Sequence, residues 1–153
     1  MRNGCKLDLG VGRGQEVCVG GVGGCYGPSD YERRSSTLRG YARRHYTHDE
    51  VERLAASQSV DIVLTHDAPA GVRFERRSRG DAYVSQAAGL NTMLARLRPR
   101  VCFFGHHHAR VDDEVSGVRC VGLNKVASPG NLVAIEFEPK GREWSLIGEY
   151  SEE

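Results

Sequence analysis

Two short apolar runs that each end in histidine constrain this chain more than any other feature. The run Asp61–Thr65 is followed directly by His66, and the run Val101–Phe104 leads into Gly105 and then three histidines. Runs of this length, rich in β-branched and aromatic residues, are typical of strands buried on both faces of a sheet. In open α/β sheets, ligands bind outside the carboxyl ends of the strands. The pattern therefore predicts histidines gathered at one edge of a sheet.

Helical patterns precede the first of these strands and separate it from the second, which predicts an α/β fold. Thr47 and Glu50 match a capping box at the start of a helix over about residues 48–57. A second helix is expected over Val84–Leu97, because apolar residues recur there at helical spacing until Pro99. Further strands are expected at Cys5–Leu9, Glu16–Val19, Gly117–Leu123, Leu132–Phe137 and Trp144–Ile147.

Two polar segments rich in arginine are expected to be loops. The first runs from Tyr26 to Tyr46 and interleaves arginine with tyrosine, a mixture that can bind a phosphate backbone and stack on bases. The alternative is a solvated loop or lid. A formal net charge of only +1 argues against a dedicated nucleic-acid coat, although nucleic acid stays a possible partner. The second segment carries Arg73, Arg76, Arg77 and Arg79.

Length and composition predict one domain over residues 1–153, large enough to bury a core. No apolar run approaches the roughly 20 residues of a membrane helix, so no membrane partner is expected. The first residues also lack the apolar core of a signal peptide, and we expect a cytoplasmic protein. The cysteines are odd in number and form no C-x-x-C pair, which favours reduced, structural thiols. They are Cys5, Cys18, Cys25, Cys102 and Cys120.

The histidines predict a metal site. His106 and His108 would point to the same side of an extended segment, because side chains alternate along a strand. With His66 they would bring three imidazoles to one sheet edge, and neutral imidazole is the commonest metal-binding side chain. The alternative is a set of ordinary surface histidines. We expect His66, His106 and His108 to hold a divalent transition metal, which could be Mn, Fe, Zn or Ni.

The two blocks also carry a family resemblance. Leu64–Pro69, which reads LTHDAP, and Phe104–His108, which reads FGHHH, resemble the last two signature blocks of the calcineurin-like metallophosphoesterases. The glycine-rich stretch Val17–Tyr26 is similar to the strand and turn before these blocks, and Asn124–Asn131 is similar to the turn after them. The resemblance implies a β-sandwich flanked by helices, with a two-metal centre that hydrolyses phosphomonoesters or phosphodiesters.

The resemblance further implies roles for single residues. His66 and His106 would bind one metal and His108 the other, about 3.5–4 Å away, so that water is activated and the phosphoryl oxygens are held during in-line attack. His107 falls at a variable position and has no implied ligand role. Asp67 would orient His66 through a hydrogen bond, or else cap a turn.

The sequence departs from the family in its early motifs. We find no D-x-H, G-D-x-x-D or G-N-H-[DE]. We therefore expect a C-terminal half, truncated at its N-terminus: a partial metallophosphoesterase-like β-sandwich with flanking helices. Three neutral imidazoles cannot offset two divalent cations, so weak or absent hydrolysis is expected of this chain alone. Half a sheet also exposes an edge that invites self-association or pairing.

Three interpretations follow from these observations. The first is a metal-dependent hydrolase that acts on a phosphorylated substrate. The second is a non-catalytic module that binds phosphate or nucleic acid through its arginine-rich segments, which would need no metal and would weaken steeply with salt. The third is a mononuclear hydrolase with a His-only site, which would hold one metal per chain.

Overall fold

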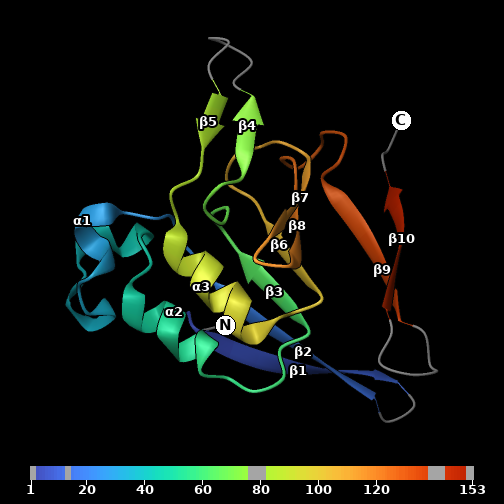
Figure 1. Cartoon of the computed structure of the whole chain (residues 1–153), viewed down its shortest axis with the longest axis horizontal. Helices are drawn as coiled ribbons and strands as arrows, with labels where there is room; N and C mark the ends of the chain where they lie inside the picture. The colour runs from blue at the N-terminus through green and yellow to red at the C-terminus, as the bar shows by residue number, and fades with distance from the viewer. Residues whose placement is uncertain (1–2, 13–14, 76–81, 138–143, 151–153) are drawn as a thin grey trace.

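A mixed six-stranded sheet lies at the centre of the computed structural model, which describes residues 3–12, 15–75, 82–137 and 144–150 (Figure 1). Its strand order is β1-β2-β3-β6-β8-β7. The middle strands β2, β3, β6 and β8 run parallel, and β1 and β7 pair antiparallel at the two edges. The α/β fold is therefore confirmed. The strands are β1 (Cys5–Gly12), β2 (Gln15–Val22), β3 (Ile62–Thr65), β6 (Val101–Phe104), β7 (Val111–Val115) and β8 (Val118–Gly122).

Two helices cover one face of this sheet (Figure 1). They are α2 (His48–Ala55) and α3 (Ala88–Leu97). The capping box begins α2 as predicted, since the backbone N–H of Thr47 donates to the Glu50 carboxylate at 3.1 Å. The helices bury Val51, Leu54, Leu90, Met93 and Leu94 against a row of sheet residues that includes Val22, Val63, Cys102, Phe104 and Cys120.

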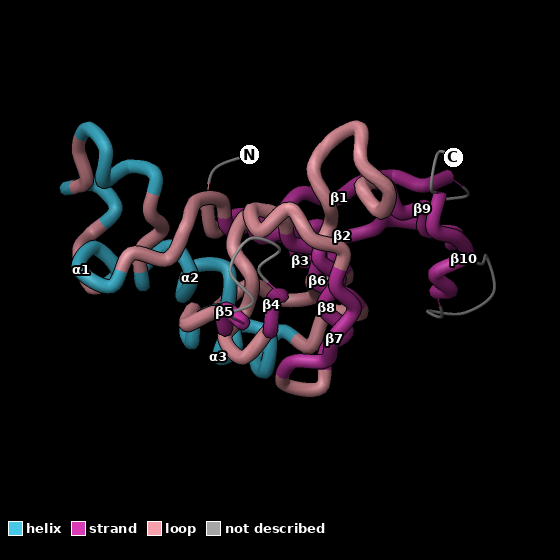
Figure 2. The backbone as a smooth tube through the Cα atoms, turned by 90° about the horizontal axis from the view of Figure 1, so that it is seen from above, coloured by secondary structure: helices cyan, strands magenta, loops and turns pink. Residues whose placement is uncertain are grey.

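Two hairpins complete the fold. Strand β4 (Arg73–Glu75) pairs with β5 (Ala82–Val84), and β9 (Leu132–Phe137) pairs with β10 (Trp144–Tyr150). Figure 2, seen from above, places the β9–β10 hairpin at the opposite end of the molecule from α2 and the short helix α1 (Pro28–Tyr31). The second arginine-rich segment, expected to be a loop, thus contributes a strand at Arg73. Its remaining arginines, Arg76, Arg77 and Arg79, lie outside the described residues.

The second predicted helix starts later than its apolar pattern indicated. The prediction of helix from Val84 was wrong, because that residue ends β5 and the chain stays extended through Ser85. The N–H of Ser85 donates to the carbonyl of Val72 at 3.0 Å, and its hydroxyl donates to the carbonyl of Ala68 at 2.7 Å. These non-local hydrogen bonds take the place of a first helical turn.

The first arginine-rich segment is folded rather than a solvated loop. It forms α1 (Pro28–Tyr31) and two 3₁₀ turns, η1 (Ser35–Thr37) and η2 (Gly40–Arg44). Tyr31 and Tyr46 are buried, with ring centroids 6.0 Å apart in an edge-to-face arrangement. Burial of these rings overrides the polar composition and anchors the segment beside α2 and the sheet.

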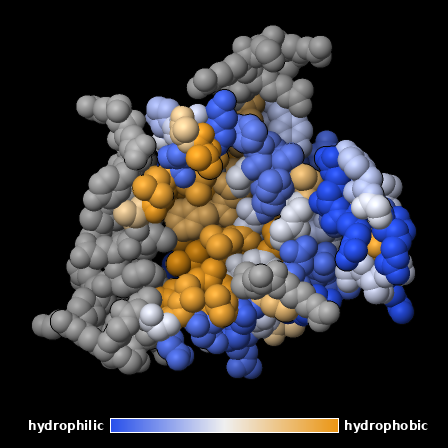
Figure 3. Space-filling view, turned by 180° about the vertical axis from the view of Figure 1, so that it is seen from behind, coloured by the Kyte–Doolittle hydropathy of each residue, from blue (hydrophilic) through white to orange (hydrophobic). Residues whose placement is uncertain are grey.

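The face of the sheet opposite the helices is only partly covered. A smaller apolar cluster lies there, and one residue of β9 packs against it. Figure 3, seen from behind, shows apolar side chains gathered in the middle of this face. Leu7, Leu9 and Leu64 remain 51%, 44% and 44% exposed. No helix within the described residues is long and apolar enough to cross a membrane.

Candidate metal centre

Three neighbouring parallel strands end side by side and position the site. Strand β2 leads to Cys25, β3 leads to His66 and β6 leads to His106. Backbone bonds continue the ladder past the strand ends: the N–H of His66 donates to the carbonyl of Val22 at 3.1 Å, and that of Gly105 to the carbonyl of His66 at 3.2 Å. The carboxyl edge of the sheet therefore gathers these side chains, as the two apolar runs predicted for His66 and His106.

The three side chains are spaced as ligands of one ion. Nε2 of His66 lies 3.1 Å from Nδ1 of His106, and Sγ of Cys25 lies 3.7 Å from the same Nδ1. One ligand atom from each residue falls within 4.8 Å of the other two. Around a tetrahedral zinc ion, usual bond lengths place two nitrogens about 3.3 Å apart and sulfur about 3.6 Å from nitrogen. The Cys25–His66–His106 group could therefore hold a metal ion.

Partial desolvation and nearby charges shift the pKa values of two of these candidate ligands toward the neutral form, although His106 is exposed. Burial lowers the pKa of the His106 imidazole, more than the nearby charge of Asp67 raises it. Burial, followed by the charge of Asp67, raises the pKa of the Cys25 thiol, while the Arg44 guanidinium opposes that shift. A neutral imidazole has a lone pair ready for a metal, whereas the thiol loses its proton when a metal binds.

Cys25 was missed as a candidate ligand by sequence reasoning, which assigned all five thiols a structural role. All five cysteines are free, and Cys18, Cys102 and Cys120 are buried. The available signal was position, because Cys25 follows a glycine-rich turn at the end of a strand. Gly24 permits that turn: its φ is +96°, and a Cβ there would lie 2.6 Å from the carbonyl oxygen of Arg44.

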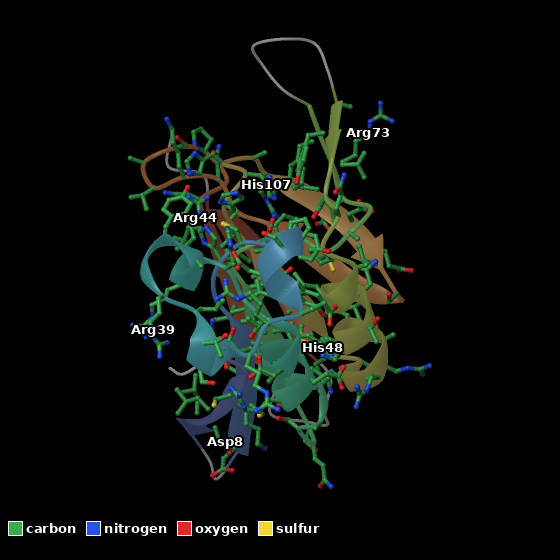
Figure 4. The ribbon with its side chains drawn as sticks, turned by 90° about the vertical axis from the view of Figure 1, so that its left-hand side faces the viewer. Asp8, Arg39, Arg44, His48, Arg73 and His107 are labelled. Atoms are coloured by element: carbon green, nitrogen blue, oxygen red, sulfur yellow. The ribbon has the colours of Figure 1, made fainter. Side chains whose placement is uncertain are left out.

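Arg44 flanks the group through backbone and side chain. The N–H of Cys25 donates to the carbonyl of Arg44 at 2.9 Å, which joins the end of η2 to the turn after β2. The Arg44 guanidinium carbon lies 4.4 Å from the centre of the Tyr41 ring, and its Nη1 donates to the Tyr41 hydroxyl. Figure 4 shows Arg44 and His107 at the same end of the molecule. The Arg44 guanidinium also lies close enough to the Cys25 thiol to act on it electrostatically.

Asp67 acts on a different histidine from the one implied by the family resemblance. Its buried carboxylate lies 3.0 Å from Nε2 of His107 and accepts the backbone N–H groups of Tyr26 at 2.8 Å and Ala68 at 2.9 Å. Burial raises the pKa of Asp67, but these hydrogen bonds, His107 first among them, hold it below its usual value. The carboxylate therefore ties the turns after β2, β3 and β6 together.

His107 is a structural residue of the site. Its ring stacks on Phe74 of β4, with centroids 4.0 Å apart and an interplanar angle of 19°. Together with the hydrogen bond to Asp67, this contact fixes the histidine cluster against the β4–β5 hairpin. The resemblance implied no ligand role for His107, and that stays a prediction.

His108 is not among the residues that the structure gathers at the candidate centre. It is exposed, as His66 and His106 are, but the group found within the described ranges consists of Cys25, His66 and His106. Both His106 and His108 have positive φ, 63° and 51°, so the segment leaves the extended conformation in which alternate side chains share a side. A ligand role for His108 stays a prediction.

Comparisons with known proteins bear on the fold alone. No family model matches the chain, and no curated protein matches it. One crystal structure is similar with a TM-score of 0.51 and 18% identity, over 80% of this chain and 45% of that one. The crystal structure of TT1561 of Thermus thermophilus has a TM-score of 0.49 and 12% identity, over 83% and 50%. The chain thus spans about half the length of these solved structures.

Proposed function

We propose that this chain forms a mononuclear metal centre of a metallophosphoesterase-type hydrolase, with Cys25, His66 and His106 as ligands. The observation that carries the proposal is the convergence of these side chains at the ends of three adjacent parallel strands, within 4.8 Å of one another. Three protein ligands with open remaining positions are typical of catalytic rather than structural zinc sites.

The donor set favours zinc over the other candidate metals. Thiolate is a soft ligand that suits zinc, whereas manganese prefers carboxylate, carbonyl and water oxygens. The buried carboxylate of Asp67, whose charge acts on Cys25, is already engaged by His107 and two backbone N–H groups. The proposed group therefore carries one negative charge, from the Cys25 thiolate. That charge suits one divalent ion better than two.

The chemistry at such a centre is hydrolysis of a phosphate ester. A bound divalent metal would polarise a phosphoryl oxygen and lower the pKa of water. The water oxygen forms a bond to phosphorus while the bond between phosphorus and the alcohol oxygen breaks. One water proton leaves with the alcohol and the other stays on the phosphate. Arg44 lies beside Cys25 and would neutralise a phosphoryl oxygen, since guanidinium matches phosphate geometry.

The test is metal content followed by hydrolysis. The chain is loaded with Zn²⁺, desalted, analysed for metal and assayed with p-nitrophenyl phosphate and bis(p-nitrophenyl) phosphate. We expect about one zinc per chain and slow turnover that His66→Ala abolishes, while His48→Ala, an exposed histidine of α2, leaves it unchanged. Absence of retained metal, or hydrolysis that survives His66→Ala, would contradict the proposal.

A second candidate is supported by the position of Arg44: binding of a phosphate group without catalysis. In that case affinity for inorganic phosphate would need no metal and would fall steeply as salt is raised. Phosphate binding measured with and without Zn²⁺, at low and at physiological salt, separates the two functions. The metal-centre proposal expects zinc to raise phosphate affinity.

A further inference from the structure

A cavity of about 330 Å³ opens on the sheet face opposite the helices, with His66 in its wall. Its other lining residues include Leu64 of β3, Gly21 and Gly23 at the end of β2, and Asn3. The volume lies at the lower end of the range of small-molecule sites. The cavity is therefore adjacent to a proposed metal ligand and large enough for a small ligand.

Strand alternation explains why the cavity is there. Ile62 packs into the apolar cluster of this face while Val63 packs under the helices, so Leu64 and then His66 point to the open face. On the adjoining strand, Gly21 pairs with Leu64 and presents no side chain to fill the space. The space beside Leu64, over Gly21 of β2, is therefore not filled by a side chain, and the backbone of β2 lies at the bottom of the cavity.

The side chains of Asn3 and Thr65 at this cavity are hydrogen-bonded within the protein, while the His66 imidazole is exposed there. The Asn3 side chain donates to the carbonyl of Gly23 and accepts its N–H, both at 2.9 Å. The Thr65 hydroxyl donates to the carbonyl of Asp67 at 2.7 Å on the helix side of the strand. Leu64 adds an aliphatic side chain that is 44% exposed. Apart from the His66 imidazole, which the proposed metal would engage, the walls thus offer mainly apolar contact.

From this arrangement we propose that the cavity receives the alcohol part of the ester, and that the site selects phosphate esters of small apolar alcohols or phenols. The proposal rests on the proposed metal centre, which would hold the phosphoryl group at His66. A sugar or a base edge would lose hydrogen bonds to water on entering an apolar cavity without regaining them, which disfavours nucleotides and nucleic acid. A flat apolar ring loses no hydrogen bonds to water when it enters the cavity.

The experiment compares two phosphonates that cannot be hydrolysed. Phenylphosphonate and methylphosphonate carry the same charged group and differ in the apolar part, so their affinities for the zinc-loaded chain are measured by titration calorimetry. Burial of a phenyl ring predicts that phenylphosphonate binds on the order of tenfold more tightly or better. Equal affinities, or tighter binding of a mononucleotide than of phenylphosphonate, would overturn the proposal.

A matched pair of variants locates the effect. Leu64→Trp fills the cavity and should bring the affinity ratio of the two phosphonates close to one. Leu9→Trp changes a leucine with the same 44% exposure, on β1 and outside the cavity lining, and should keep the wild-type ratio. A ratio unchanged in Leu64→Trp would place the ring elsewhere and refute the assignment.

The same data distinguish failure of this inference from failure of the metal centre. If zinc is retained and both phosphonates bind equally, the metal centre stands and the cavity has no role in selection. If zinc is not retained, or neither phosphonate binds to the zinc-loaded chain, the proposed function itself fails and this inference fails with it. Comparison of the two ligands on the unmodified chain tests the proposal even if Leu64→Trp does not fold.

Discussion

Replacement of Cys25 by alanine tests the proposed centre most directly. The Cys25 sulfur lies 3.7 Å from Nδ1 of His106, close to the roughly 3.6 Å expected around tetrahedral zinc, so it needs little movement to bind. Structural zinc sites with four ligands bind with about 10–16 kcal/mol, which is on the order of 3 kcal/mol per ligand. Loss of one ligand should weaken zinc binding about 100-fold.

The assay is competition for Zn²⁺ with a chromophoric chelator, supported by elemental analysis after desalting. Cys5→Ala is the matched control, because Cys5 is a partly exposed free thiol on β1 and not a member of the group. The variant His108→Ala distinguishes the geometry from the family resemblance, which implies that His108 is a ligand. The geometry predicts that zinc affinity changes by less than a few fold in this variant. The reasoning is refuted if Cys25→Ala binds zinc as the unmodified chain does, or if His108→Ala loses more affinity than Cys25→Ala.

Three further predictions concern the stability of the fold that positions the site. Leu54→Ala should lower the free energy of unfolding by about 2–5 kcal/mol in urea titrations, because Leu54 is fully buried, whereas Leu7→Ala at a 51% exposed position should change it by less than about 0.5 kcal/mol. Asp67→Asn should lower the free energy of unfolding by about 1–3 kcal/mol, because the amide NH₂ would face the N–H groups that now donate to the carboxylate. An unchanged urea midpoint would contradict this. Hydrogen bonds from His45, then Arg33, lower the pKa of Asp30, so its stabilising contribution is present above about pH 4 and is lost as pH falls through the lowered value. The urea midpoint of the unmodified chain should therefore fall more between pH 5 and pH 3 than that of Asp30→Asn, and parallel curves would exclude the effect.

The elements predicted well are those with a strong local signal. Strand β6 matches the predicted run Val101–Phe104, and β9 matches Leu132–Phe137. The capping box placed the start of α2 at His48. In each case apolar pattern and flanking residues agree, so that tertiary contacts reinforce what the local sequence already favours.

The elements missed depend on partners far along the chain. Val84 carries a helical pattern, but β5 forms because β4 offers it a strand to pair with, and Ser85 then bonds to Val72. The segment 26–46 looks polar throughout, yet Tyr31 and Tyr46 bury their rings together. Local propensity carries no information about such long-range contacts, and here the contacts decide the structure.

Cys25, the third candidate ligand, was also missed because its position depends on contacts that are distant in the sequence. His66 and His106 follow apolar strands directly, so the strand-end rule finds them, whereas Cys25 lies beyond a glycine turn that is set in place by hydrogen bonds with Arg44 and Tyr46. Its inclusion also changes what the absent early motifs imply. A centre with two imidazoles and one thiolate needs no bridging carboxylate if it holds a single metal ion that accepts soft ligands, such as zinc. The departure from the family pattern is then compatible with the proposal of a single zinc ion, whose candidate ligand His66 also lines the cavity.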